Sequence, residues 1–147
     1  MSHTTSIRSI KIQSIPALEA AVAELAGKGI RVSLISNATP RAYYQGQQGM
    51  GKADYVIQLA DAPYDVGIYK DGENGGYEAR TDFFMGSVEK ILGARASSQE
   101  HAQQARMGKL FQAYAINAAQ MEARRKGYST RRIAGADGVE KLVVTGF

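Results

Sequence analysis

The fold is decided by residues 98–127, which read SQEHAQQARMGKLFQAYAINAAQMEARRKG. Apolar side chains recur there every three or four residues, at Met107, Leu110, Phe111, Tyr114, Ala118 and Met121. This spacing places them on one face of a helix, at roughly 100° per residue. The stretch has no proline, and only Gly108 interrupts its good helix formers. We predict one helix, about 40 Å long at ~1.5 Å per residue, that buries this stripe against a sheet.

Both ends of the predicted helix carry recognisable signals. Ser97 or Ser98 can cap its start, because a serine hydroxyl accepts hydrogen bonds from the first free amides. The last turn holds consecutive cations, which the helix dipole favours there, and Gly127 follows as a natural end.

The chain before this helix opens with a strand, a helix and a second strand. Residues 7–13 alternate as a strand does. Ser14 stands at a helix N-cap position, with Pro16 in the first turn, where a missing N–H costs least. That helix ends at the glycines 27 and 29, and residues 30–35 alternate again. The sequence therefore predicts a β-α-β opening.

The remaining segments read as short strands joined by turns. Asp-Gly and Asn-Gly pairs between alternating runs are typical of hairpins. The expected strands are residues 55–59, 64–68, 77–81, 128–133 and 139–144, with a weakly helical connector at 86–97. Because short turns join antiparallel strands, we predict one α+β domain spanning residues 1–147. Its mainly antiparallel sheet would be covered by a short N-terminal and a long C-terminal helix, and the chain would end in a β-hairpin.

Composition restricts the possible functions. The chain has 147 residues, of which 44% are hydrophobic and 22% charged, as in ordinary globular domains. It has no cysteine, which excludes disulfides, thiolate metal sites and a cysteine nucleophile. The two histidines, His3 and His101, lack the spacing of a zinc site. We predict no metal and no cofactor, and, because no apolar run has the length of a signal peptide or membrane span, a cytoplasmic location.

Positive charge is concentrated in the C-terminal third. Residues 1–97 carry ten Lys/Arg and ten Asp/Glu, whereas residues 98–147 carry eight and four, which gives the whole net charge of +4. The helical spacing predicts a basic ridge on the side away from the apolar stripe, with Asn117 and Gln120 between its cations, and the hairpin extends it. The ridge comprises Arg106, Lys109, Arg124, Arg131 and Arg132. It could contact phosphates or be a solvated helix face.

The glycine-rich segment 36–52 is a candidate binding loop. Arg41, Tyr43 and Tyr44 lie together in it, and exposed tyrosines beside an arginine can anchor a protein partner or stack on a ring. They can equally fold back on the edge of the core. The glycine spacing matches neither the dinucleotide fingerprint nor a phosphate-binding loop.

Three aspartates are candidates for acid–base chemistry. Asp54, Asp65 and Asp82 each stand at a predicted strand edge beside aromatic residues, where a carboxyl pKa can rise. Catalysis or Mg²⁺ binding would require them to converge in one pocket. The alternative is that each caps a turn or pairs with Arg31, Arg41 or Arg80.

Short motifs along nearly the whole chain support a family resemblance. They are Met1-Ser2-His3, Ala53-Asp54-Tyr55-Val56-Ile57, Tyr64-Asp65-Val66-Gly67, Gly76-Tyr77-Glu78, the aromatic pair after Asp82, Tyr114-Ala115, Lys126-Gly127-Tyr128, Asp137-Gly138 and Leu142-Val143-Val144. With these motifs the chain resembles the conserved hypothetical open-reading-frame family of algal chloroplast and cyanobacterial genomes, domain of unknown function 1257. Family members tend to have tryptophan where this chain has Phe83 and Phe84. The resemblance implies no particular reaction, and it hints at an AAA-type ATPase as a partner.

These observations favour a small, non-catalytic protein that binds another macromolecule as an adaptor or assembly factor. A protein is the expected partner, and homo-oligomers through the long helix are possible, since small or neutral residues on it allow close approach. One alternative is non-specific nucleic-acid binding through the basic ridge. Another is a small enzyme that uses the strand-edge aspartates.

Overall fold

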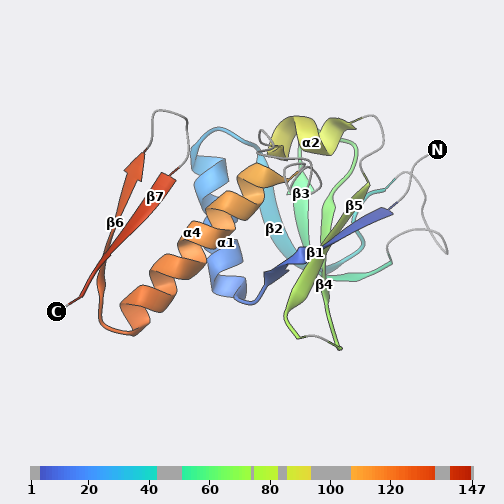
Figure 1. Cartoon of the computed structure of the whole chain (residues 1–147). Helices are drawn as coiled ribbons and strands as arrows, with labels where there is room; N and C mark the ends of the chain where they lie inside the picture. Colours follow the sequence, from blue (N-terminus) through green and yellow to red (C-terminus); the bar gives the residue numbers. More distant parts are fainter. Residues whose placement is uncertain are drawn as a thin grey trace.

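The computed structural model describes residues 4–42, 51–73, 75–82, 86–93, 107–134 and 140–146, and for residues 4–10 the backbone alone. In chain order the elements are β1 (Thr4–Ile12), α1 (Ile15–Gly27), β2 (Val32–Ala38), β3 (Ala53–Leu59), β4 (Val66–Lys70), β5 (Tyr77–Asp82), α2 (Ser87–Leu92), α4 (Gly108–Arg125), β6 (Ser129–Ala134) and β7 (Glu140–Thr145). The predicted α+β class, the β-α-β opening and the closing hairpin are confirmed (Figure 1).

The larger sheet has five strands in the order β1-β5-β4-β3-β2, and every neighbouring pair is antiparallel. Strands β1 and β2, which are consecutive in the chain, therefore form opposite edges of the sheet. Helix α1 connects these two edges. The strands β3, β4 and β5 form the expected meander, and the turn between β4 and β5 is closed where the amide of Asp71 donates to the carbonyl of Gly76 at 2.9 Å.

Helix α1 begins as the sequence predicts. Ser14 is its N-cap, and the Ser14 hydroxyl accepts a hydrogen bond from the amide of Ala17 at 3.2 Å. A proline occupies the first turn, and Lys28 ends the helix before Gly29, whose φ of 93° suits glycine. Local signals therefore mark both ends of α1.

Helices α1, α2 and α4 cover one face of the sheet and share its main core. The sheet contributes alternate residues of β3, β4 and β5, since successive side chains of a strand point to opposite faces. The fully buried large side chains in this core include Ile12, Leu18, Ile57, Leu59, Val66, Ile68, Val88, Leu92, Met107 and Leu110.

Tyr114 of α4 ties this helix to the start of α1. Its side chain is buried, and its hydroxyl accepts hydrogen bonds from the amides of Gln13 at 2.7 Å and Ser14 at 3.1 Å. These two amides lie between the end of β1 and the N-terminus of α1. One side chain of α4 therefore satisfies the backbone at the corner where the chain leaves the sheet.

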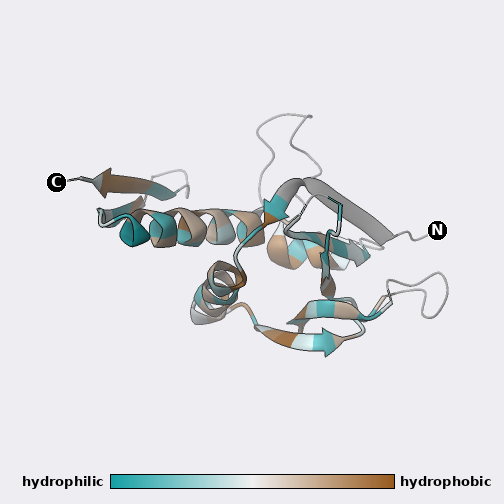
Figure 2. Ribbon diagram, turned by 90° about the horizontal axis from the view of Figure 1, so that it is seen from below, coloured by the Kyte–Doolittle hydropathy of each residue, from teal (hydrophilic) through white to brown (hydrophobic). Residues whose placement is uncertain are grey.

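The apolar stripe of α4 is buried only over its first half. Leu110, Phe111 and Tyr114 are at most 6% exposed and Ala118 packs at the margin of the core, but Met121 is 38% exposed. The prediction that Met121 packs in the core is wrong, because α4 extends past the sheet it covers (Figure 2). Figure 2 shows the hairpin lying along this projecting part of the helix.

The predicted single helix is not continuous at Met107, and its part over residues 98–106 lies outside the described residues. Helix α4 begins at Gly108, and Met107 before it has a non-helical backbone, with φ of −127° and ψ of 33°. At ~1.5 Å per residue the 18 residues of α4 span about 27 Å rather than 40 Å. The predicted caps at Ser97 and Ser98 lie outside the described residues.

A smaller cluster lies on the opposite face of the sheet. The ring of Tyr69 in β4 lies over Gly67, and the guanidinium of Arg80 in β5 stacks on that ring at 4.5 Å from its centre. Burial is the main cause that raises the pKa of Tyr69 to about 12, and its hydroxyl donates to the carbonyl of Gly51 at 2.9 Å. Glycine at position 67 allows this approach of ring to backbone.

Replacing Gly67 with alanine is expected to lower the free energy of unfolding by about 1–3 kcal/mol, as overpacking does. A Cβ at this position would lie 2.5 Å from Cε1 of Tyr69, whose ring is held by Arg80 and Gly51. Urea unfolding measures the change. The matched control is Gly27→Ala at the end of α1, where an added Cβ meets nothing within 4 Å and stability is expected to stay level or rise. Equal midpoints for the two variants would refute the account of Gly67.

Candidate interaction surface of the C-terminal arm

The C-terminal arm comprises the second half of α4 together with β6 and β7, residues 117–134 and 140–146. Strands β6 and β7 pair only with each other within the described residues, with Arg132 opposite Leu142 and Arg131 opposite Val143. A two-stranded ribbon is marginally stable alone in water. The hairpin therefore depends on its contacts with α4 and with the end of α1.

Arg132 makes the main polar connection between the hairpin and the body. Its guanidinium donates to Glu24 Oε1 of α1 at 2.5 Å, to Asn117 Oδ1 at 3.1 Å and to Gln120 Oε1 at 3.1 Å. Glu140 Oε2 of β7 lies 3.5 Å from the same guanidinium. Arg132 thus joins α1, α4 and both strands of the hairpin at one point.

The electrostatics of Glu24 follow from this network. Partial burial, the largest single influence, acts to raise its pKa, but it is outweighed by the hydrogen bonds from Arg132 and Asn117 and by the charges of Arg132 and Lys28. The pKa of Glu24 is therefore lowered from its ordinary value of 4.5. Since a lowered pKa means that folding favours the ionised form, Glu24 stabilises the hairpin contact as a carboxylate.

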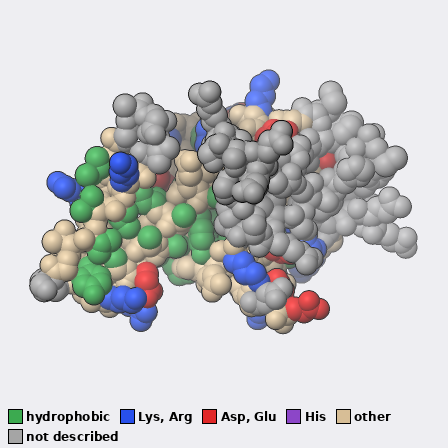
Figure 3. All heavy atoms as spheres, in the orientation of Figure 1, with side chains coloured by type: hydrophobic (Ala, Val, Ile, Leu, Met, Phe, Trp, Pro, Cys, Tyr) green, Lys and Arg blue, Asp and Glu red, His purple; other side chains and the backbone are tan. Residues whose placement is uncertain are grey.

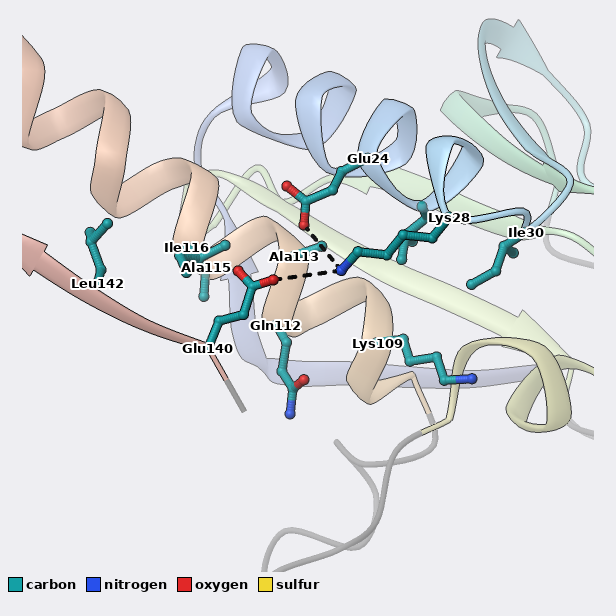
Figure 4. A pocket seen from close by; sticks show the side chains of 11 residues that line it. Glu24, Lys28, Ile30, Lys109, Gln112, Ala113, Ala115, Ile116, Glu140 and Leu142 are labelled. Atoms are coloured by element: carbon teal, nitrogen blue, oxygen red, sulfur yellow. Dashed lines mark ion pairs between the residues drawn. The ribbon is translucent and has the colours of Figure 1, made fainter. Parts of the chain in front are cut away.

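A cavity of about 680 Å³ opens beside this network, between α1, α4 and β7 (Figure 4). Its apolar wall includes Leu25 and Ile30 from the body, Ile116 of α4 and Leu142 of β7. At its rim, Nζ of Lys28 lies 3.8 Å from Glu24 and 3.6 Å from Glu140, as Figure 4 shows. The cavity is therefore apolar inside and has paired charges at one side.

Large hydrophobic side chains are exposed on the arm. Figure 3 shows hydrophobic side chains gathered over the part of the molecule formed by α4 and the hairpin, with Lys and Arg around them. Among the described residues, the exposed large hydrophobic side chains are Met121 at 38%, Tyr128 and Ile133 at 42%, and Val144 at 46%. All of them belong to the arm, and the five-stranded body contributes none within the described ranges.

The predicted basic ridge is not one continuous surface. Lys109 lies at the rim of the cavity, and Arg124 and Arg131 are exposed, but Arg132 turns inward to Glu24. Asn117, predicted to lie among the outward cations, is 8% exposed and donates to the carbonyl of Ala113 at 2.7 Å. The prediction that this side of α4 faces solvent is wrong for Asn117 because the end of α1 and the hairpin cover it. Arg106 lies outside the described residues.

Of the three candidate residues in the glycine-rich segment, Arg41 is described. Its guanidinium donates to Asp65 Oδ1 at 2.7 Å and to the carbonyl of Leu59 at 2.7 Å, and its amide donates to Asp65 Oδ2 at 2.9 Å. The hydrogen bonds to Asp65 are the main cause that raises the pKa of Arg41. Arg41 therefore anchors the segment after β2 to the sheet. Tyr43 and Tyr44 lie outside the described residues.

The candidate aspartates do not converge in one pocket. Asp54 accepts from the amide of Lys70 at 2.8 Å, at the far end of β4, whereas Asp65 immediately precedes that strand. Five strand residues at ~3.3 Å each separate them by about 17 Å. Asp82 ends β5 at the same end of the sheet as Asp65, and it is 2% exposed. Together the three therefore cannot form the pocket that the enzyme alternative requires.

Sequence reasoning missed Glu24 and gave Arg132 an outward role. Glu24 and Lys28 are four residues apart on α1, a spacing typical of ordinary surface ion pairs. No local signal relates Glu24 to Arg132, which is 108 positions away. Their contact arises from the packing of α4 on α1.

The comparisons with known proteins add no relative. The chain matches no family model, no curated protein and no solved structure. Within the described residues, no group of three or more His, Cys, Asp or Glu side chains could hold a metal ion, and no helix is both long and apolar enough to cross a membrane.

Proposed function

We propose that this chain is a non-catalytic cytoplasmic adaptor or assembly protein that binds another protein through the C-terminal arm. The observation that carries the proposal is the placement of Met121, Tyr128, Ile133 and Val144, which are all on the arm and all more than a third exposed. Single scattered apolar residues are normal on a protein surface, but here all four of the exposed large ones in the described ranges are on the arm, with Ile133 on one face of the hairpin and Val144 on the other.

The arm also has the shape of a docking element. It projects beyond the five-stranded sheet, and the cavity beside it has apolar walls from Ile116 and Leu142. A partner's aromatic or aliphatic side chain placed there would be removed from water on several sides, as the central side chains of an interface usually are. The AAA-type ATPase suggested by the family resemblance is the partner class that we propose to examine first.

The charges of the arm favour a protein over nucleic acid. A phosphate-binding ridge needs several free cations on one face. Arg132 already neutralises Glu24, and Lys28 lies between Glu24 and Glu140. Arg125 and Lys126 pair with Glu122. The exposed Arg124, Arg131 and Lys141 remain for the rim of an interface, where such charges steer association more than they strengthen it.

The test compares two double variants in pull-downs from the native host. Ile133→Ser with Val144→Ser removes exposed apolar groups from the arm and is expected to lose the partner that the natural chain retains. The control, Lys52→Ser with Gln58→Ser, changes exposed polar positions on the body and is expected to retain it. Mass spectrometry identifies the protein that differs, and circular dichroism checks that both variants fold. Equal recovery of every partner by both variants would refute the proposal.

A further inference from the structure

The outer edge of β2 has no neighbouring strand among the residues that the structure describes. The amide of Ala60 donates to the carbonyl of Arg31 at 3.1 Å, so Arg31 is hydrogen-bonded toward β3. In an antiparallel ladder such positions alternate, which directs the backbone groups of Leu34 and Ser36 away from β3. Within the described residues, β2 pairs with β3 alone.

The two edges of this sheet differ in their protection against pairing. The edge strand β1 contains Arg8 and Lys11, and its register with β5 shifts between Ile7 and Ile12. Charges and irregular register are the usual devices that keep an edge from joining another strand. Strand β2 reads VSLISNA and has no charge and no proline over its seven residues. Its backbone is irregular only at Asn37, whose φ is 52°, so the β2 edge lacks the protection that β1 has over residues 32–36.

A groove runs along this unprotected edge, between β2 and α1. Its volume is about 430 Å³, and it is lined by Val22, Ala23 and Ala26 of α1 and by Val32 and Leu34 of β2, among others. Ala23 and Ala26 are exposed, and their small side chains leave room for atoms beside the helix. An added strand at the β2 edge would thus meet both open backbone groups and a mainly apolar wall, in which the exposed Glu19 of α1 is the charged member.

We infer that β2 pairs antiparallel with β2 of a second copy of this chain, which joins two five-stranded sheets into one sheet of ten strands. Antiparallel pairing of a strand with its own copy fits a twofold axis, the commonest symmetry of protein dimers. With Leu34 on that axis, Val32 lies opposite Ser36 and Ser33 lies opposite Ile35, so the pairing uses the extended residues before Asn37, whose φ is 52°. Like charges directly opposite each other destabilise a strand pair. Because β2 is uncharged, pairing it with its own copy places no like charges opposite each other.

The same symmetry brings the two α1 helices together. A twofold axis perpendicular to the sheet keeps both helices on the same face of the joined sheet. The exposed Ala23 and Ala26 border the groove that the second copy would fill. The groove is lined by Val22, Ala23 and Ala26 of α1, whereas the arm contacts this helix at Glu24 and Lys28, so the arm remains available for the protein partner.

Light scattering on the full chain tests the inference. The natural chain is expected to have a mass of about 32 kDa, twice the 15.9 kDa of one copy. Ser36→Pro removes an outward N–H at the edge and is expected to give 15.9 kDa. Ser36→Lys places a charge at an exposed edge position and is expected to do the same without restricting the backbone. The control, Gln58→Lys, adds the same charge at an exposed position on the inner strand β3 and is expected to stay dimeric.

Two outcomes would overturn the inference. One is a natural chain that stays at 15.9 kDa at every concentration. This result would overturn the inference even if another protein bound at the β2 edge. The other is a dimer that persists in both Ser36→Pro and Ser36→Lys, which would place the interface elsewhere. The arm variant Ile133→Ser with Val144→Ser is expected to remain dimeric, so failure of the dimer and failure of partner binding are separable.

Discussion

Replacing Tyr114 with phenylalanine is expected to lower the free energy of unfolding by about 2–3 kcal/mol. The hydroxyl accepts hydrogen bonds from the amides of Gln13 and Ser14, and its loss leaves both donors without this partner. Each buried donor left unsatisfied costs about 1–3 kcal/mol, and these half-buried ones belong at the low end of that range. Denaturant unfolding at neutral pH measures the change.

Tyr128→Phe is the matched control for this prediction. It removes the same hydroxyl from a tyrosine that is 42% exposed at the start of the hairpin, and such surface changes are usually within about 0.5 kcal/mol. If the two variants unfolded at the same denaturant concentration, Tyr114 would not hold the corner between β1 and α1.

Replacing Arg132 with methionine is expected to release the hairpin from the body. The change removes the cation that Glu24, Asn117 and Gln120 share, and it leaves Glu24 partly buried without that partner. The side chains of Arg132 and Glu24 are 26% and 20% exposed, so we expect the free energy of unfolding to fall by about 1–2 kcal/mol. Hydrogen exchange should show faster exchange of β6 and β7 amides, with β3 and β4 unchanged.

Arg131→Met is the control, because Arg131 is the exposed neighbour that faces the other side of the same strand. In the Arg131→Met variant, the amides of β6 and β7 are expected to keep their protection against hydrogen exchange. Equal loss of protection in both variants would mean that general charge, rather than the Arg132 network, holds the arm in place.

The pH dependence of the hairpin provides a separate measurement of the same network. The pKa of Glu24 is lowered in the folded chain, so its contribution is fully present above the ordinary value of 4.5. It is lost as the pH falls through the folded-state pKa, where the carboxylate becomes protonated. Acid should therefore weaken hairpin protection in the natural chain, and Glu24→Gln should show weaker protection at neutral pH and a flatter dependence below pH 4.5.

The elements of this fold could be predicted from local patterns. Ser14 and Pro16 indicate the start of α1, and the alternation of residues 55–59 and 77–81 indicates strands, because capping and pleating depend on near neighbours. The antiparallel class followed from the short turns between them. Each of these inferences uses physics that acts over a few residues.

The arm could not be predicted in the same way. Periodicity places Met121 on the apolar face of α4, but it does not tell how far the sheet beneath that face extends. Arg132 and Asn117 read as outward polar residues because their partner, Glu24, lies in a helix near the other end of the chain. Tertiary packing decides which side of a helix faces solvent. Here the hairpin covers the side of α4 that holds Asn117, which the polar residues there predict to be exposed.

The central claim is that the apolar surface of the arm binds a protein partner. The most direct measurement is a calorimetric titration of the purified partner, identified in the pull-down, into the natural chain and the two double variants. We expect Ile133→Ser with Val144→Ser to weaken the Kd by about a hundredfold or more, since losing two interface anchors commonly costs at least ~2–3 kcal/mol. Lys52→Ser with Gln58→Ser should leave the Kd unchanged. An arm variant that binds as tightly as the natural chain would contradict the account.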